Sequence, residues 1–172
     1  MVETILERID RLTAGVDNAQ ELSHEDKVKL VYPEEFAIWG QELKTKDEIE
    51  RALQKKFRAG TTSRFTKAIR DYELFVEGEK IGVSISGGKD SLLLAKLFQA
   101  IKLYGDFNFD LEFFCMDPGY AEANRKLMEF NLAWLGIPAR IYDSNIFEVS
   151  EASKGKPCYL CARMRRGFLY AK

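Results

Sequence analysis

Two short stretches of this sequence carry the residue types that could do chemistry. The first, SGGKDS, covers Ser86 to Ser91 and follows an apolar run, and the second, PCYLCARMRRGFLY, covers Pro157 to Tyr170. Adjacent glycines let backbone N–H groups approach an anion without a Cβ in the way, and a helix that begins there adds about half a positive charge. We therefore expect the first stretch to bind phosphate groups.

The second stretch contains a C-x-x-C pair, Cys158 and Cys161. Such a pair at the beginning of a helix lowers thiol pKa values and can ligate zinc or iron, but a reduced or locally oxidised pair without a metal also fits the spacing. The remaining cysteine, Cys115, lies in an apolar run and is expected in the core. Three cysteines in a chain of 172 residues do not make a disulfide scaffold, which favours a reducing, cytoplasmic compartment.

Strands and helices alternate around these two stretches. Residues 81–86, 109–116 and 139–143 are predicted strands, and residues 90–105 and 120–136 between them are predicted helices. Short connections between them predict an α/β fold: a parallel sheet with right-handed crossovers and helices on both faces. Ligands of such sheets gather at the carboxyl ends of the strands, where SGGKDS and the turn after the second strand both lie.

The chain before this alternation is expected to be mainly helical. We divide it into an α-helical region, 1–78, and an α/β domain, 79–172. Thr45 and Glu48 form a capping box before a helical pattern that ends at Gly60, and residues 63–75 continue helically. His24 is most simply a surface residue. No apolar run approaches the roughly 20 residues that cross a bilayer, and the N-terminus lacks the features of a secretory signal, so no membrane partner is expected.

Charge is distributed unevenly, although the net charge is only −1. Residues 1–50 contain 6 Lys/Arg and 13 Asp/Glu, residues 51–70 contain 7 and none, and residues 152–172 contain 6 and none. Each basic stretch is either an anion-binding strip or a solvated helix face. The rings of Phe57 and Phe65, which lie within the first basic stretch, are expected to pack inward.

SGGKDS after an apolar strand resembles the PP-loop of the N-type ATP pyrophosphatases. The resemblance implies that ATP and Mg²⁺ bind there. ATP phosphates would contact Ser86, Gly87, Gly88, Lys89, Asp90 and Ser91. Asp90 would be catalytic and lie near the Mg²⁺, and backbone groups around Met116 and Asp117, in FCMDPGY, would hold the adenine. A plain turn at the end of the strand is the other interpretation of Asp117 and Pro118.

Together, the PP-loop, the C-x-x-C and the R-x-R-R-G-x-L-Y that follows it are similar to TtcA-type tRNA 2-thiocytidine synthetases, from about Glu50 to Lys172. This resemblance implies that ATP adenylates a tRNA cytidine and that sulfur, supplied by a donor protein, displaces AMP. Cys158 and Cys161 would act in catalysis as ligands of a 4Fe-4S cluster. Arg163, Arg165 and Arg166, with Lys172, would contact phosphates of ATP or tRNA, or form a solvated helix face.

Family members continue beyond this region with a third cluster cysteine that nothing here matches, and Cys115 does not occupy its position. The first strand is also expected to have an open outer edge, because its next neighbour would come after Lys172. We therefore expect either that the chain is a fragment or that this strand is covered by the N-terminal third or by a second copy in a homodimer. Two alternatives to thiolation stay open: a non-catalytic ATP-binding or self-associating fragment, and a PP-loop enzyme acting on another acceptor.

Overall fold

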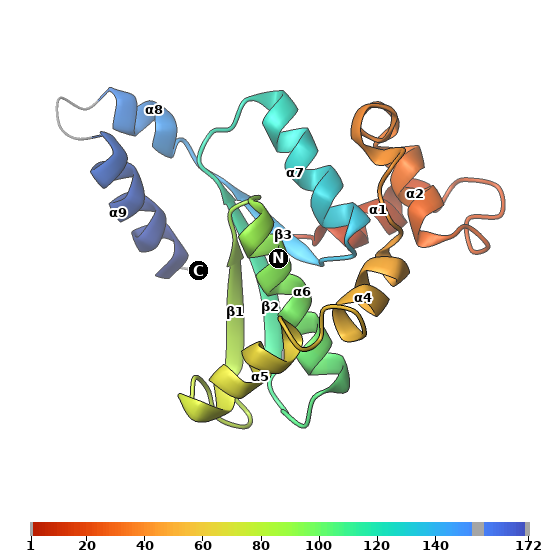
Figure 1. Ribbon diagram of the computed structural model, residues 1–172. Helices are drawn as coiled ribbons and strands as arrows, with labels where there is room; N and C mark the ends of the chain where they lie inside the picture. Colours follow the sequence, from red (N-terminus) through yellow and green to blue (C-terminus); the bar gives the residue numbers. More distant parts are fainter. Residues whose placement is uncertain (1, 153–156, 171–172) are drawn as a thin grey trace.

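The sheet lies at the centre of the computed structural model, which describes residues 2–152 and 157–170. Strands β1 (Lys80–Ile85), β2 (Asp110–Asp117) and β3 (Ala139–Asp143) are parallel and lie in the order β1-β2-β3 (Figure 1). In the register of the sheet Ile85 lies beside Cys115, and Cys115 lies beside Ile141. The three strands and the α/β class predicted from the sequence are confirmed.

Helices α6 (Lys89–Tyr104) and α7 (Glu122–Trp134) cover one face of the sheet. Two right-handed crossovers in the same direction place both helices on the same side. Val83, Ile85 and Phe113 are buried on this face, and the Cys115 Sγ donates a hydrogen bond of 3.0 Å to the Met128 Sδ of α7. The core therefore forms between the strands and these two helices.

The second face of the sheet is covered less fully. Helices α8 (Ile146–Glu151) and α9 (Pro157–Tyr170) follow β3, and the ring of Phe168 on α9 contacts the ring of Tyr142 at 6.3 Å between centroids. Further along this face Ser84 is exposed, and Lys80 pairs with Glu112 at 2.9 Å. Helices thus contact both faces, as predicted, but the packing on the second face is thinner.

The N-terminal third is helical, as predicted. Its elements are α1 (Ile5–Thr13), α2 (His24–Val31), α3 (Pro33–Glu35), the π-helix η1 (Phe36–Gly40), α4 (Lys46–Gln54) and α5 (Thr62–Asp71). The Thr45–Glu48 capping box is present at the beginning of α4, and Ser23 caps α2. Ile5 and Val28 belong to the same hydrophobic cluster as Val83. The division at residues 78 and 79 stays a prediction.

Three sequence predictions in this region are wrong. The helix from Thr45 ends at Gln54, not near Gly60, because the Phe57 N–H bonds to the carbonyl of Ala52 (2.9 Å) while the carbonyl of Leu53 accepts the Thr62 hydroxyl (3.2 Å). The Phe57 side chain is consequently 48% exposed, whereas Phe65 packs on Phe98 as expected. His24 is half-buried, and its Nε2 donates to the carbonyl of Ala133 at 2.8 Å.

The N-terminal third does not cover the outer edge of β1. Instead, Thr4 forms an antiparallel bridge with Arg140 on β3, at the opposite edge of the sheet. Within the described ranges β1 pairs only with β2. The alternative that the N-terminal third covers this edge is therefore wrong, because α1 packs against α7 and β3 instead.

Among residues 2–152 and 157–170, no helix combines the length and the hydropathy that a membrane-spanning helix needs.

A buried lysine joins α6 to α4 and to the end of α7. The side chain of Lys96 is 3% exposed, and its Nζ donates to the Glu50 carboxylate (2.6 Å) and to the carbonyl of Leu135 (2.9 Å). Burial lowers the pKa of Lys96 even though the Glu50 carboxylate opposes that effect. The Glu50 carboxylate therefore stabilises the charged form of the buried Lys96 ammonium group.

Replacing Glu50 by alanine should leave this ammonium group with one carbonyl and no carboxylate in hydrogen-bond contact. We expect Glu50→Ala to lower the free energy of unfolding by about 2 kcal/mol in urea denaturation. Asp47→Ala is the matched control on the same helix, because the Asp47 side chain is 74% exposed and its carboxylate lies 3.8 Å from the Lys46 Nζ. This control should lower the free energy of unfolding by less than about 0.5 kcal/mol. Equal losses in the two variants would contradict this account of Lys96.

Candidate functional site

The loop from Ser86 to Ser91 turns the chain from β1 into α6. Gly87 has a φ of +83°, which L side chains rarely adopt, and Gly88 is the N-cap residue of α6. No side chain caps this helix, so its first N–H groups are left for another acceptor. The Ser91 Oγ donates to the carbonyl of Gly88 (2.8 Å) and accepts from the Ser86 N–H (3.3 Å). These hydrogen bonds hold the loop together, while the N-terminal end of α6 stays open to a ligand.

Lys89 and Asp90 stand in the first turn of α6. Their side chains are 90% and 89% exposed, and the Lys89 Nζ lies 3.1 Å from the Asp90 Oδ1. An ion pair this exposed contributes little stability and exchanges easily for other partners. Both charges are therefore available to an incoming ligand, the lysine to a phosphate and the carboxylate to a hard cation such as Mg²⁺.

The end of β2 lies beside this loop. Strand β1 ends opposite Cys115, whereas β2 continues through Met116 and Asp117, which pair only with Tyr142 and Asp143 on β3. In the part of the chain that is described, no strand occupies the β1 side of these two residues. Their backbone edge is therefore open toward the loop. The Met116 side chain itself is buried.

Asp117 organises the turn that follows β2. Its Oδ1 accepts the N–H groups of Gly119 (2.8 Å) and Tyr120 (2.7 Å), and its Oδ2 pairs with Arg125 at 2.5 Å. Burial raises the pKa of the Asp117 carboxyl, but these N–H groups and the guanidinium together outweigh burial and hold the pKa below its ordinary value. Asp117 is therefore a carboxylate that shapes the turn.

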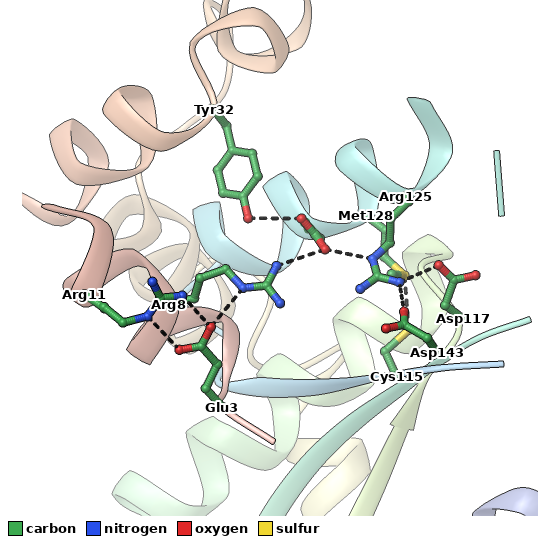
Figure 2. A network of polar contacts seen from close by, with 10 residues as sticks. Glu3, Arg8, Arg11, Tyr32, Cys115, Asp117, Arg125, Met128 and Asp143 are labelled. Atoms are coloured by element: carbon green, nitrogen blue, oxygen red, sulfur yellow. Dashed lines mark hydrogen bonds and ion pairs between the residues drawn. The ribbon is translucent and has the colours of Figure 1, made fainter. Parts of the chain in front are cut away.

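Arg125 connects this turn with the rest of the molecule (Figure 2). Its guanidinium also pairs with Asp143 at the end of β3 (2.5 Å) and with Glu129 one turn further along α7 (2.7 Å). Glu129 in turn pairs with Arg8 of α1 (3.1 Å) and accepts the Tyr32 hydroxyl (3.3 Å). Sequence reasoning missed this network. Its only local signal was the i,i+4 spacing of Arg125 and Glu129.

Cys158 and Cys161 lie one turn apart near the beginning of α9. Cys158 is exposed and Cys161 half-buried, and both line a hollow of about 810 Å³ together with Phe147 and Arg165. A 4Fe-4S cluster takes four ligands, usually thiolates. Among the described residues no group of three or more cysteine, histidine or acidic side chains is placed to hold a metal ion. These two thiols match half of such a ligand set and do not complete it.

Two aromatic residues join the loop to the hollow. The Tyr120 hydroxyl donates to the carbonyl of Ser86 at 3.4 Å, and its ring lies edge-on to the ring of Phe147, with 5.8 Å between centroids. Phe147 also lines the hollow with the cysteine pair. The structure thus brings Ser86 and the cysteines to the same edge of the sheet. Tyr120 and Phe147 were not expected from the sequence, although both follow strand ends.

The other predicted residues have different surroundings. Cys115 is buried, as expected, and burial raises the pKa of its thiol to about 12. Arg165 and Arg166 line the hollow, and Arg163 is exposed on the same helix. Lys172 lies outside the described residues. Arg165 and Arg166 therefore lie beside the thiols, whereas Arg163 does not line the hollow.

A parallel sheet with a glycine–glycine–lysine–aspartate loop after its first strand defines the class as a PP-loop α/β fold. Over 76% of its length the chain is 35% identical to a tRNA-cytidine(32) 2-sulfurtransferase of Aeromonas salmonicida, and over 73% it is 35% identical to one of Cellvibrio japonicus. One of Anaeromyxobacter dehalogenans is 34% identical over 72%. The chain is homologous to these sulfurtransferases and spans 41–43% of their length. No protein-family model matches it.

The Asp117–Arg125 pair should be visible in the acid stability of the chain. Because the folded-state pKa of Asp117 is depressed, its stabilisation is present above the unfolded pKa of about 3.9 and is lost as pH falls through the folded value. We expect Asp117→Asn to cost about 2 kcal/mol at pH 7 and to flatten the loss of stability below about pH 4.

Asp143→Asn provides the control for that experiment. Both carboxylates contact the same Arg125 Nη1 at 2.5 Å, but the Asp143 side chain is 79% exposed and the Asp117 side chain 9%. The control should therefore cost less than about 1 kcal/mol in the same urea titrations. A larger loss for Asp143→Asn than for Asp117→Asn would show that burial does not decide the strength of these pairs.

Thiol labelling should separate the cysteines. We expect a thiol reagent at pH 8 to label Cys158 and Cys161 in the native reduced chain, and Cys115 only after denaturation, because its buried thiol stays protonated. Mass spectrometry of labelled peptides assigns each adduct. The Cys115→Ala variant should show the same number of adducts before and after denaturation. Labelling of Cys115 at the rate of the other two would contradict its placement.

Proposed function

We propose that this chain binds ATP at Ser86–Ser91 and uses it to activate a base of tRNA for thiolation. The observation that carries the proposal is the open N-terminal end of α6 after Gly87 and Gly88, beside the exposed Lys89 and Asp90. Backbone N–H groups aligned with a helix dipole form a binding site for phosphate. Homology to tRNA-cytidine(32) 2-sulfurtransferases supports the choice of substrate.

Different parts of the loop have separate proposed roles. The N–H groups of the loop would bind the phosphates of ATP, and Lys89 would neutralise their charge. Asp90 would hold Mg²⁺ through its carboxylate, which suits a cation that takes few protein oxygens and several phosphate oxygens. The open backbone edge at Met116 and Asp117 would hold the adenine.

The reaction proposed has two steps. The C2 oxygen of a tRNA cytidine attacks the α-phosphorus of ATP, which forms an adenylated base and releases pyrophosphate. Sulfide (HS⁻) supplied by a donor protein then attacks C2, and AMP leaves with the original oxygen while the sulfur loses its proton. Cys158 and Cys161 are the residues proposed to position that sulfide, because they line a hollow joined to the loop through Tyr120 and Phe147. No step is assigned to an iron–sulfur cluster.

A non-catalytic ATP-binding fragment is the competing proposal, because among the described residues only Cys158 and Cys161 line the hollow and no third ligand is placed beside them. The two proposals differ in turnover. We expect the chain to release AMP and pyrophosphate from ATP when an unmodified tRNA transcript is present, measured by separation of radiolabelled nucleotides. ATP binding without any such release would favour the fragment.

Asp90→Ala tests the loop itself. We expect it to weaken Mg²⁺-ATP binding by at least about tenfold in isothermal titration, because a carboxylate that shares the cation with the phosphates is lost. Its unfolding transition should not change, since the Asp90 side chain is 89% exposed. Asp17→Ala is the matched control, because Asp17 is exposed in a turn of the N-terminal third and does not belong to the Ser86–Ser91 loop. This variant should bind ATP normally. Retained affinity in Asp90→Ala would overturn the assignment of the loop.

A further inference from the structure

A second surface of the molecule is strongly basic and lies away from the loop. It is made of the turn after α4 and the exposed side of α5, and we call it the basic surface. Its members are Lys55, Lys56, Arg58, Arg64, Lys67 and Arg70. Residues 51–70 contain 7 lysines and arginines and no acidic residue. A concentration of one sign of charge raises the local concentration of oppositely charged ligands.

Most cations of the basic surface have no internal counter-charge. In the described ranges no carboxylate forms an ion pair with Lys55, Lys56, Arg58 or Arg64. The N-terminal helices differ, because their cations pair with nearby acids: Arg8 and Arg11 with Glu3, Lys27 with Asp10, and Lys29 with Asp26. The unpaired cations repel one another, so an external polyanion would relieve that repulsion.

The basic surface borders a groove of about 700 Å³ between α5 and the C-terminal end of α6. Arg58, Lys67 and Arg70 line it together with the hydroxyl-bearing residues Thr62 and Ser63. Guanidinium, ammonium and hydroxyl groups are the side chains that contact nucleic-acid phosphates most often. The groove therefore has the chemistry of a backbone-binding site.

Two acidic residues also line the groove, and they do not close it. Asp71 pairs with Lys67, and Asp106 pairs with Arg70 at 3.4 Å. The Asp71 side chain is 47% exposed and the Asp106 side chain 92%. Such exposed pairs are worth little, so a phosphate can replace the carboxylate at small cost.

Exposed aromatic rings accompany these cations. Phe57 is 48% exposed, and the Lys56 Nζ lies 5.3 Å from its ring centroid. Tyr104, at the end of α6, is 64% exposed and lines the groove. Aromatic faces next to cations stack with unpaired bases of single-stranded nucleic acid. This combination favours RNA with exposed loop bases over an acidic protein.

The basic surface lies at the end of α6 opposite the Ser86–Ser91 loop, as Figure 1 shows for α5 and the lower half of α6. With 16 residues, α6 is about 24 Å long. One nucleotide cannot reach both ends, but a folded RNA can. We infer that the basic surface binds the phosphate backbone of a folded RNA and anchors it while another part of the RNA reaches the loop. The identity of that RNA as tRNA rests on the proposed function.

The test measures RNA binding without ATP. Fluorescence anisotropy with a labelled tRNA transcript is recorded at several salt concentrations for the intact chain and two triple variants. The first variant is Lys55→Gln, Arg58→Gln and Arg64→Gln. The control is Lys27→Gln, Lys29→Gln and Lys126→Gln, which makes the same change in net charge on α2 and α7. Unchanged circular dichroism melting curves establish that each variant is folded.

We expect the first variant to bind at least about tenfold more weakly at 100 mM salt and to lower the slope of log K against log salt by about 2 to 3, while the control binds normally. Equal losses in both variants would mean that net charge alone attracts the RNA, and would overturn the inference. Displacement of the RNA by polyglutamate at equal charge concentration would also overturn it, in favour of an acidic protein.

ATP titrations of the same variants distinguish the two proposals. The Lys55, Arg58 and Arg64 variant should keep Mg²⁺-ATP binding, and Asp90→Ala should keep RNA binding. Loss of ATP binding in Asp90→Ala together with RNA binding that is insensitive to the basic surface would leave the loop assignment intact and overturn the RNA anchor. Normal ATP binding in Asp90→Ala, together with RNA binding that depends on the basic surface, would overturn the loop assignment alone.

Discussion

The carboxyl edge of the sheet depends on the guanidinium group of Arg125. This one group contacts the ends of two strands, through Asp117 and Asp143, and it holds Glu129 on its own helix. Asp117 in turn holds the N–H groups of the turn from which Tyr120 reaches the loop. The guanidinium makes these contacts from two nitrogens, Nη1 and Nε, whose positions are fixed by a planar group, whereas a lysine ammonium presents all of its donors from one atom. Because the arginine is largely buried, each carboxylate compensates a charge that could not otherwise stay there.

The same network explains why the N-terminal helices pack where they do. Glu129 links Arg125 to Arg8 and Tyr32, so α1 and α2 are fixed against α7 and not against the open edge of β1. The loop lies at one end of α6, the basic surface lies at the other end, and the thiols lie on α9. A rigid helix between two regions sets the distance that a shared substrate must span.

Local rules predicted much of this structure. The capping box at Thr45 and Glu48 and the alternation of strands and helices depend on residues within about four positions of each other, so the sequence contains them directly. The end of α4 was predicted wrongly because Phe57 continues the apolar spacing of the helix. In the structure the Leu53 carbonyl bonds to the Thr62 hydroxyl, and the chain turns before Phe57 can pack. Periodicity identifies a helix more reliably than it identifies the end of one.

By itself, the sequence determined the order of the strands and helices and the glycine loop after β1, because backbone preferences, caps and hydrophobic periodicity act over short separations. Only the tertiary structure decided which charges meet. Arg8 and Glu129 are 121 positions apart and are brought together by the packing of α1 on α7. The packing of α2 on α7 likewise places His24 against the end of α7. Long-range polar contacts depend on which helix faces touch, and side chains from distant segments decide that together.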